Sequence, residues 1–162
     1  MGLGHLCGVV MNSLQPALTP CAGRCSTVFG DSVCRGCRRF SHEVIDWNRY
    51  TPTQREYIWQ RLDQQLDQIV LPLLAVAEDM QLQRFMDARQ LRLPAHASKG
   101  RQVYEVLRVC QRQPQLLDES GLALSSAQLE PYWQAVERRL YALAVASFEF
   151  AWLRAAQFQS GT

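Results

Sequence analysis

The sequence predicts an all-α protein in which a small four-cysteine metal-knuckle module precedes an α-helical bundle of about four to five helices. Three observations lead to this prediction: four clustered cysteines, long stretches with apolar residues three and four positions apart, and no alternating strand pattern. The expected organisation is an irregular leader over residues 1–19, the metal-binding module over 20–50 and the helical bundle over 51–162.

The length, composition and net charge of the chain exclude several classes of protein. The chain has 162 residues, of which 48% are hydrophobic, so it has the material for a core. Its 17 basic and 15 acidic residues leave a net charge of only +2, which argues against a protein that coats nucleic acid. No stretch reaches the ~20 apolar residues of a membrane span, and the N-terminus lacks secretory-signal features. We therefore expect a cytoplasmic protein without a membrane segment, starting at Met1 or Met11.

The strongest chemical signal is a pair of cysteine motifs, Cys-x3-Cys and Cys-x2-Cys, formed by Cys21, Cys25, Cys34 and Cys37. Each motif can present two sulfurs from one tight turn, and the loop between them lets the turns face each other, as a tetrahedral four-thiolate site requires. The alternatives are two disulfides or small buried residues. Reduced thiols are the rule in the cytosol, which favours metal ligands.

Zinc and iron–sulfur clusters both accept four thiolates. The spacing lacks the cysteine order of bacterial-type and plant-type cluster proteins, and two short knuckles are more typical of structural zinc. We expect zinc, with an iron–sulfur cluster as the alternative.

Four arginines stand beside the expected ligands: Arg24, Arg35, Arg38 and Arg39. The favoured interpretation is that they stabilise the negatively charged thiolates. The alternative is a patch that contacts phosphate or RNA, with stacking from Phe29, Phe40 or Trp47.

After the cysteines, the pattern predicts a short helix over about 42–49. Thr51, Pro52 and Gln54 have the types of an N-cap, a first helical residue and a capping-box partner. Apolar residues then recur at helical spacing, and Pro72 interrupts them, so we expect either a kink there or two helices, over about 52–71 and 72–91.

Two more helices are expected. One covers about 99–112, with Cys110 as a small core residue, and a loop follows over 114–124. The last helix runs from about Ser125 to about Gln157. Its segment 140–153 is apolar almost all round, which predicts the central helix of the bundle.

The motifs in order resemble the bacterial domain-of-unknown-function family 1289 (DUF1289) over about residues 19–62. The matching residues are Thr19-Pro20-Cys21-x3-Cys25, Cys34-x-Gly36-Cys37-x-Arg39, Glu43-Val44-x-x-Trp47 and Tyr50-Thr51-x-x-Gln54-Arg55. Members of this family look like short cytosolic proteins, and they tend to be labelled predicted iron–sulfur proteins. The resemblance implies that the family's ligands fall on the same four cysteines.

No catalytic constellation is evident: the sequence supports no Ser-His-Asp or Cys-His pairing, and it contains no glycine-rich phosphate loop and no HExxH motif. We expect a non-catalytic accessory or interaction protein with a protein partner. The alternatives are an iron–sulfur electron carrier or redox sensor and an RNA- or phosphate-binding module.

Overall fold

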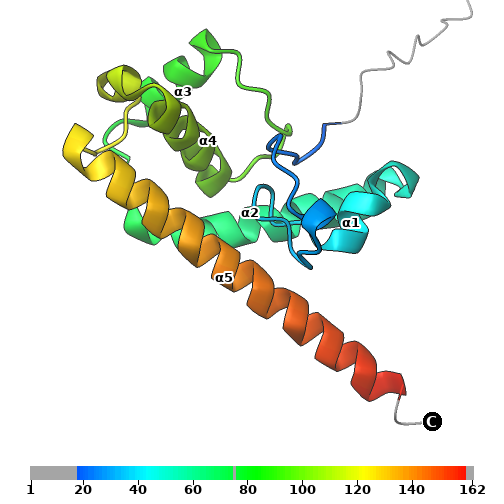
Figure 1. Ribbon diagram of the computed structural model, residues 1–162. Coiled ribbons are helices and arrows are strands. Elements are labelled where there is room, and N and C mark those ends of the chain that lie inside the picture. Colours follow the sequence, from blue (N-terminus) through cyan, green and yellow to red (C-terminus); the bar gives the residue numbers. More distant parts are fainter. Residues whose placement is uncertain (1–17, 75, 160–162) are drawn as a thin grey trace, which may run out of the picture.

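The computed structural model describes residues 18–74 and 76–159, and most of them are helical (Figure 1). The α-helices are α1 (Ser41–Ile45), α2 (Pro52–Leu73), α3 (Asp79–Ala88), α4 (Lys99–Arg112) and α5 (Ser126–Gln159). Short 3-10 helices are η1 (Thr27–Phe29), η2 (Trp47–Arg49) and η3 (Pro114–Glu119). In these two ranges β pairing is limited to two isolated bridges. The predicted all-α architecture is confirmed, whereas most of the predicted leader, with Met1 and Met11, lies outside the described residues.

Helix α2 begins as predicted. The Thr51 hydroxyl accepts the N–H of Gln54 at 3.2 Å, and the Gln54 side chain accepts the N–H of Thr51 at 2.8 Å. Two separate helices form in this region, as one of the two predictions requires, but α2 continues through Pro72 to Leu73 and α3 is shorter than predicted. Pro72 has no N–H to donate to the carbonyl four residues before it, but the N–H of Leu74 still donates to the carbonyl of Val70 at 2.9 Å. The chain leaves the helix at Leu74, and α3 starts at Asp79.

Helix α4 matches its predicted range and packs closely against α2. Ser98 caps it by accepting the N–H of Arg101 at 3.1 Å. The N–H of Gly100 donates to the Asp67 carboxylate of α2 at 2.8 Å, and Arg101 pairs with Asp63 of α2 at 2.8 Å. The expected loop after α4 contains the 3-10 helix η3.

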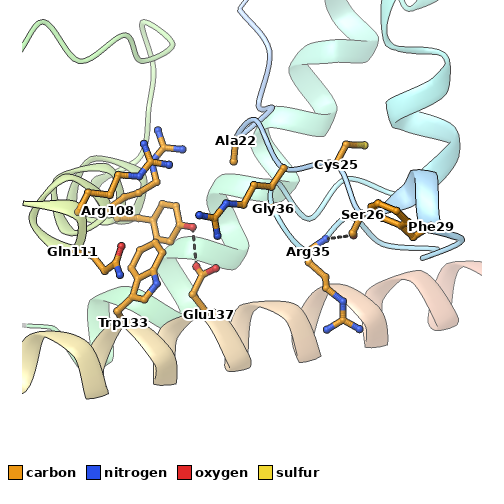
Figure 2. Close-up of a pocket in the computed structure, with 13 residues that line it drawn as sticks. Ala22, Cys25, Ser26, Phe29, Arg35, Gly36, Arg108, Gln111, Trp133 and Glu137 are labelled. Atoms are coloured by element: carbon orange, nitrogen blue, oxygen red, sulfur yellow. Dashed lines mark hydrogen bonds between the residues drawn. The ribbon is translucent and has the colours of Figure 1, made fainter.

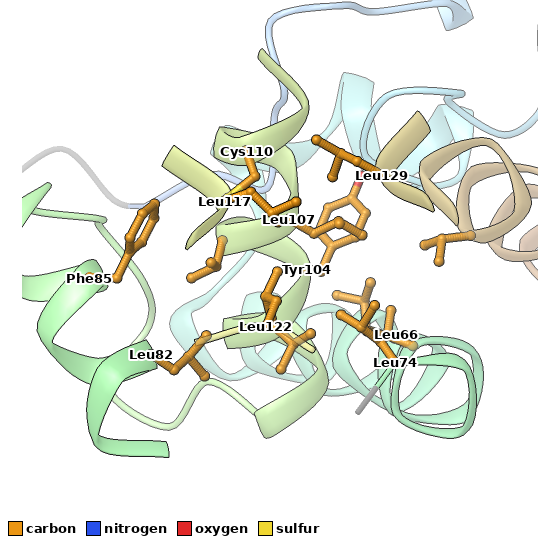
Figure 3. Close-up of a cluster of buried hydrophobic side chains, with 14 of the residues drawn as sticks. Leu66, Leu74, Leu82, Phe85, Tyr104, Leu107, Cys110, Leu117, Leu122 and Leu129 are labelled. Atoms are coloured by element: carbon orange, nitrogen blue, oxygen red, sulfur yellow. The ribbon is translucent and has the colours of Figure 1, made fainter. Parts of the chain in front are cut away.

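The main hydrophobic core lies where α2, α3, α4, η3 and the first half of α5 meet (Figure 3). Its innermost side chains, each with almost no exposed surface, include Leu82, Val103, Leu107, Cys110, Leu117 and Val136. Cys110 is therefore a core residue, as predicted, and burial raises the pKa of its thiol.

Helix α5 is only partly a core helix. Its buried residues are Leu129, Val136, Leu140 and Ala144. From residue 149 to its end at 159 every residue is exposed, including Phe150 and Trp152. The C-terminal end of α5 projects beyond the other elements in Figure 1. The predicted central position is therefore wrong for 149–153, because a uniformly apolar pattern does not reveal where the neighbouring helices stop.

Candidate metal centre and adjoining pocket

Cys34 and Cys37 lie in one tight hairpin that is closed by backbone hydrogen bonds. Val33 and Phe40 form an antiparallel bridge across its base. Inside it, the N–H of Cys34 donates to the carbonyl of Arg39 at 2.8 Å, and the N–H of Arg38 donates to the carbonyl of Cys34 at 2.8 Å. The expected Cys-x2-Cys knuckle is thus formed by main-chain geometry.

The sulfur of Cys34 has an environment suited to a negative charge. Its residue is only 2% exposed, and burial by itself raises the pKa of the thiol. Backbone hydrogen bonds from Cys37, Ser26 and Gly36 outweigh burial and lower the pKa from 9.0 to about 7. Because these donors stabilise the thiolate, the hairpin favours the form of cysteine that binds metals.

Cys37 is buried beside an arginine. Burial raises the pKa of its thiol, while the Nε of Arg39, which donates to the sulfur at 3.3 Å, opposes that rise. The guanidinium of Arg39 also lies over the Trp47 ring, 4.8 Å from its centroid. Arg39 therefore has the expected position of a cation that stabilises a thiolate.

The first cysteine motif is not gathered with the second. Cys21 is exposed and its sulfur accepts the N–H of Gly23 at 3.4 Å, whereas half-buried Cys25 lies 3.1 Å from the hydroxyl of Thr27. Across residues 18–74 and 76–159, no three His, Cys, Asp or Glu side chains stand close enough together to hold a metal ion. The five cysteines in these ranges are free thiols.

The two cysteine loops, residues 21–25 and 34–37, nevertheless come into contact at Gly36. A Cβ atom built at Gly36 would lie 2.4 Å from the carbonyl oxygen of Arg24. That same carbonyl is 3.5 Å from the Cys34 sulfur, which donates to it. Only a residue without a side chain permits this approach, so Gly36 brings the segment from 21 to 25 against the knuckle.

The four arginines beside the cysteines divide into two buried and two exposed residues. Arg38 and Arg39 are 6% and 4% exposed, and their guanidinium groups have partners inside the protein. Arg24 and Arg35 are exposed. Arg35 pairs with Asp31 at 3.1 Å and lies 4.5 Å from the centroid of the Tyr141 ring. Of the four arginines predicted to contact phosphate or nucleic acid, Arg24 and Arg35 are accessible to such a ligand. Arg38 and Arg39 are buried and contact groups of the protein itself.

Arg38 joins the knuckle to the helices. It donates to the hydroxyl of Tyr104 on α4 at 2.7 Å and to the carboxylate of Glu137 on α5. Tyr104 also donates to Glu137 at 2.8 Å, and burial together with this carboxylate raises the pKa of Tyr104 to about 12. On the other side, Trp47 packs on Ile58 of α2. The module is thus docked on α2, α4 and α5.

A pocket of about 530 Å³ lies between the cysteine loops and the helices. We call it the arginine pocket. Its loop wall includes Arg24, Cys25 and Arg35, and its helix wall includes Arg108, Arg112 and Trp133. Figure 2 shows the two walls on opposite sides of the view, with Cys25, Ser26 and Phe29 on one side and Arg108, Gln111 and Trp133 on the other.

Sequence reasoning found Arg24 and Arg35 but missed the helix wall. Tyr104, Arg108, Trp133 and Glu137 lie about 70 to 100 residues after the hairpin, and no local motif links them to it. The available signal was weak: Arg108 and Arg112 are four residues apart, so they share one face of a helix.

Comparison with known protein families identifies the family of the N-terminal part of the described chain. Residues 19–66 match the family described as Protein of unknown function (DUF1289). The match confirms the resemblance seen in the cysteine and tryptophan motifs. The DUF1289 region covers the hairpin, α1 and the first two thirds of α2, while α3, α4 and α5 lie outside it. No curated protein and no solved structure matches the chain.

Proposed function

We propose that this chain is a non-catalytic accessory protein of the bacterial cytoplasm whose DUF1289 region binds zinc through Cys21, Cys25, Cys34 and Cys37. The observation that carries the proposal is the environment of Cys34, a buried thiol whose pKa the backbone N–H groups of Cys37, Ser26 and Gly36 lower to about 7. N–H donors of this kind orient and stabilise metal-bound thiolates. The same knuckle holds Cys37 beside the guanidinium of Arg39.

The donor chemistry fits a four-thiolate site, with the second knuckle built and the first on the adjoining loop. Contact between Arg24 and Gly36 holds the loop of Cys21 and Cys25 next to the knuckle. The proposal requires the sulfurs of Cys21 and Cys25 to turn towards the Cys34–Cys37 pair. Bound zinc would supply a structural cross-link, with a binding free energy of roughly 10 kcal/mol or more available to stabilise the module.

Metal analysis of protein purified without oxygen, together with a visible spectrum of the same sample, tests the proposal. We expect one zinc per chain and no visible absorption. Iron with sulfide and a charge-transfer band would replace it with the alternative, an iron–sulfur electron carrier or redox sensor. Protein without either metal after expression in supplemented medium would overturn both.

Cysteine variants assign the ligands. Cys34→Ser should lose the metal and unfold the module, because a hydroxyl is a much poorer zinc ligand than a thiolate. Cys110→Ala is the matched control, since Cys110 is a buried thiol in the main core, and it should keep one zinc per chain. Retention of both metal and fold by Cys34→Ser would contradict the ligand assignment.

Metal should also change the reactivity of the first motif. Exposed Cys21 and half-buried Cys25 should react quickly with an alkylating reagent in stripped protein, whereas zinc should protect them. If zinc protects only Cys34 and Cys37, the four-thiolate assignment is wrong.

We further propose that the partner is a protein and that it covers the exposed end of α5. Phe150, Trp152, Leu153 and Phe158 there are each more than 60% exposed, a concentration of apolar surface that is typical of interaction sites. No helix of the described residues is long and apolar enough to cross a membrane. In gentle cell extracts the chain should elute as a larger complex, and Phe150→Asp with Trp152→Asp should release it. Elution of the wild-type chain at its own mass of 18.5 kDa would contradict this.

A further inference from the structure

We propose that the arginine pocket binds a small ligand that carries a planar ring and a phosphate group, the chemistry of a nucleoside monophosphate. The inference can be tested separately from the zinc proposal, because Arg112 and Trp133, the residues that its test changes, lie on α4 and α5, although Arg24 of the first cysteine loop also lines the pocket. It rests on the charge of the pocket, on its aromatic surface and on its size.

The pocket concentrates positive charge that the protein does not neutralise itself. Of its four arginines, Arg35 is paired with Asp31 and Arg108 with Glu105. Arg24 and Arg112 have no ion-pair partner within residues 18–74 and 76–159. Two free guanidinium groups match the charge of about −2 that a phosphate monoester carries near neutral pH.

Among the described residues that line the pocket, the one carboxylate, that of Glu137, does not cancel this charge. Glu137 accepts hydrogen bonds from Arg38 and from the hydroxyl of Tyr104 at 2.8 Å. Arg38 is only 6% exposed and contacts this carboxylate from inside the protein. The negative charge of Glu137 is thus compensated from behind, and Arg24 and Arg112 remain available to an anion.

Aromatic side chains stand on both walls. Trp133 is stacked on Tyr104, with ring centroids 5.5 Å apart and planes inclined by 22°. The stack holds the half-buried Trp133 in a fixed orientation at the pocket. On the loop wall Phe29 is 88% exposed (Figure 2). Arginines beside the fixed ring of Trp133 supply the contacts that a phosphorylated nucleoside needs, to its phosphate and to its base.

The volume of the arginine pocket, and its difference in charge from a second pocket, support the assignment of an anionic ligand. The volume of about 530 Å³ lies within the roughly 300–1,000 Å³ of small-molecule sites. A second open pocket of about 330 Å³ lies between α2 and the segment before α4, and the described residues that line it include Glu56, Asp63 and Asp67 but no arginine. An anionic ligand therefore has a reason to choose the arginine pocket over the other one.

Calorimetric titration of the full chain, as purified with its metal, tests the proposal. The probes are adenosine monophosphate, adenosine and inorganic phosphate. We expect saturable binding of the nucleotide, tighter than that of either fragment. Arg112→Gln should weaken nucleotide binding roughly tenfold, since it removes one charge-assisted contact. Trp133→Leu should weaken the nucleotide more than it weakens inorganic phosphate, because only the nucleotide has a base to stack.

Arg84→Gln is the matched control. Arg84 is an exposed arginine of α3 outside the pocket lining, so this variant should bind like the wild type. Equal losses in Arg84→Gln and Arg112→Gln would show non-specific attraction and overturn the proposal. So would the absence of binding at millimolar nucleotide, or affinity for inorganic phosphate equal to that for the nucleotide. An oligoribonucleotide that binds where the mononucleotide does not would replace the proposal with an RNA interface.

Metal content, measured on each sample, separates this proposal from the previous one. Arg112 is exposed at the end of α4, so Arg112→Gln should leave both fold and zinc unchanged. Nucleotide binding without zinc would overturn only the metal assignment, and zinc without nucleotide binding would overturn only the pocket assignment.

Discussion

Arg38 of the cysteine hairpin donates a hydrogen bond of 2.7 Å to the hydroxyl of Tyr104 on α4, and both side chains are buried. The backbone of Arg38 is left-handed, with φ of 62°, which costs a residue other than glycine about 1 kcal/mol or more. A glycine would avoid this cost but would lose the guanidinium contacts. Arg38 therefore both closes the knuckle turn and fastens it to the helices.

Arg38→Met should lower the free energy of unfolding by roughly 2–4 kcal/mol. Its loss leaves the buried hydroxyl of Tyr104 and the partly exposed carboxylate of Glu137 without their cationic partner. Denaturation in urea, followed by far-ultraviolet circular dichroism, measures the change. Arg49→Met removes an arginine that is 85% exposed and forms a surface ion pair with Asp46, so it should change stability little. Similar losses in the two variants would show that the contacts of Arg38 are not stabilising.

Gly36→Ala should weaken zinc binding by a factor of roughly ten or more. A factor of ten corresponds to a loss of about 1.4 kcal/mol in binding free energy. Its Cβ would meet the Arg24 carbonyl at 2.4 Å, so the two cysteine loops must separate. Competition with a chromogenic chelator measures the affinity. Gly30→Ala is the control: Gly30 has φ of 95° and no atom within 4 Å of the added Cβ, so it introduces local strain without separating the loops. Unchanged affinity in Gly36→Ala would mean that the loops need not touch.

Local signals in the sequence predicted local structure correctly. The capping residues Thr51 and Gln54 start α2, and the Cys34–Cys37 spacing forms a knuckle with main-chain hydrogen bonds. Both features depend on residues a few positions apart, so their chemistry can be read from the chain directly. The apolar stripes predicted the helices for the same reason.

Features that depend on distant residues could not be predicted. Arg38 and its partner Glu137 are 99 residues apart, and the sequence gives no reason to pair them rather than other charged residues. The arginine pocket forms only when the hairpin docks on α4 and α5. Helix α5 shows the same limit, because its apolar pattern continues from the core into solvent without a change.

Gly100→Ala should destabilise the protein by roughly 1–3 kcal/mol. This is the reverse of the usual effect, since a helix is normally more stable with alanine than with glycine by about 1 kcal/mol. An added Cβ would lie 2.4 Å from Oδ1 of Asp67 and 2.7 Å from its backbone nitrogen. The backbone of α2 cannot rotate away as a side chain can, so the two helices must move apart. Thermal unfolding measures the effect, and a rise in Tm would show that α2 and α4 pack less closely than described.

Replacing Phe150 and Trp152 by serine should change the free energy of unfolding by less than about 0.5 kcal/mol each. These side chains are 62% and 70% exposed and contribute little to the core. Leu140→Ala in the same helix should cost roughly 2–5 kcal/mol, because Leu140 is 1% exposed. Urea denaturation compares the three variants. A large loss from the exposed positions would indicate that the end of α5 packs against something in the isolated protein.

Tyr104 should make stability fall at alkaline pH. Its pKa is about 12 in the folded protein against an ordinary value of 10.0, mainly because the phenol is buried. Below pH 10 both states keep the proton. Between about pH 10 and pH 12 the unfolded state loses it while the folded state retains it, so the contribution of Tyr104 to stability is lost as the pH rises.

Tyr104→Phe removes this titrating group. Its free energy of unfolding should be lower near pH 8, because the hydrogen bonds to Arg38 and Glu137 are gone, yet it should fall less steeply than that of the wild type above about pH 10. Urea denaturation at about pH 9 and about pH 11 measures both slopes. Tyr57→Phe changes a tyrosine that is 67% exposed and should keep the wild-type slope. If Tyr104→Phe also keeps that slope, the phenol titrates as an ordinary tyrosine, and its burial against Arg38 and Glu137 does not persist in solution.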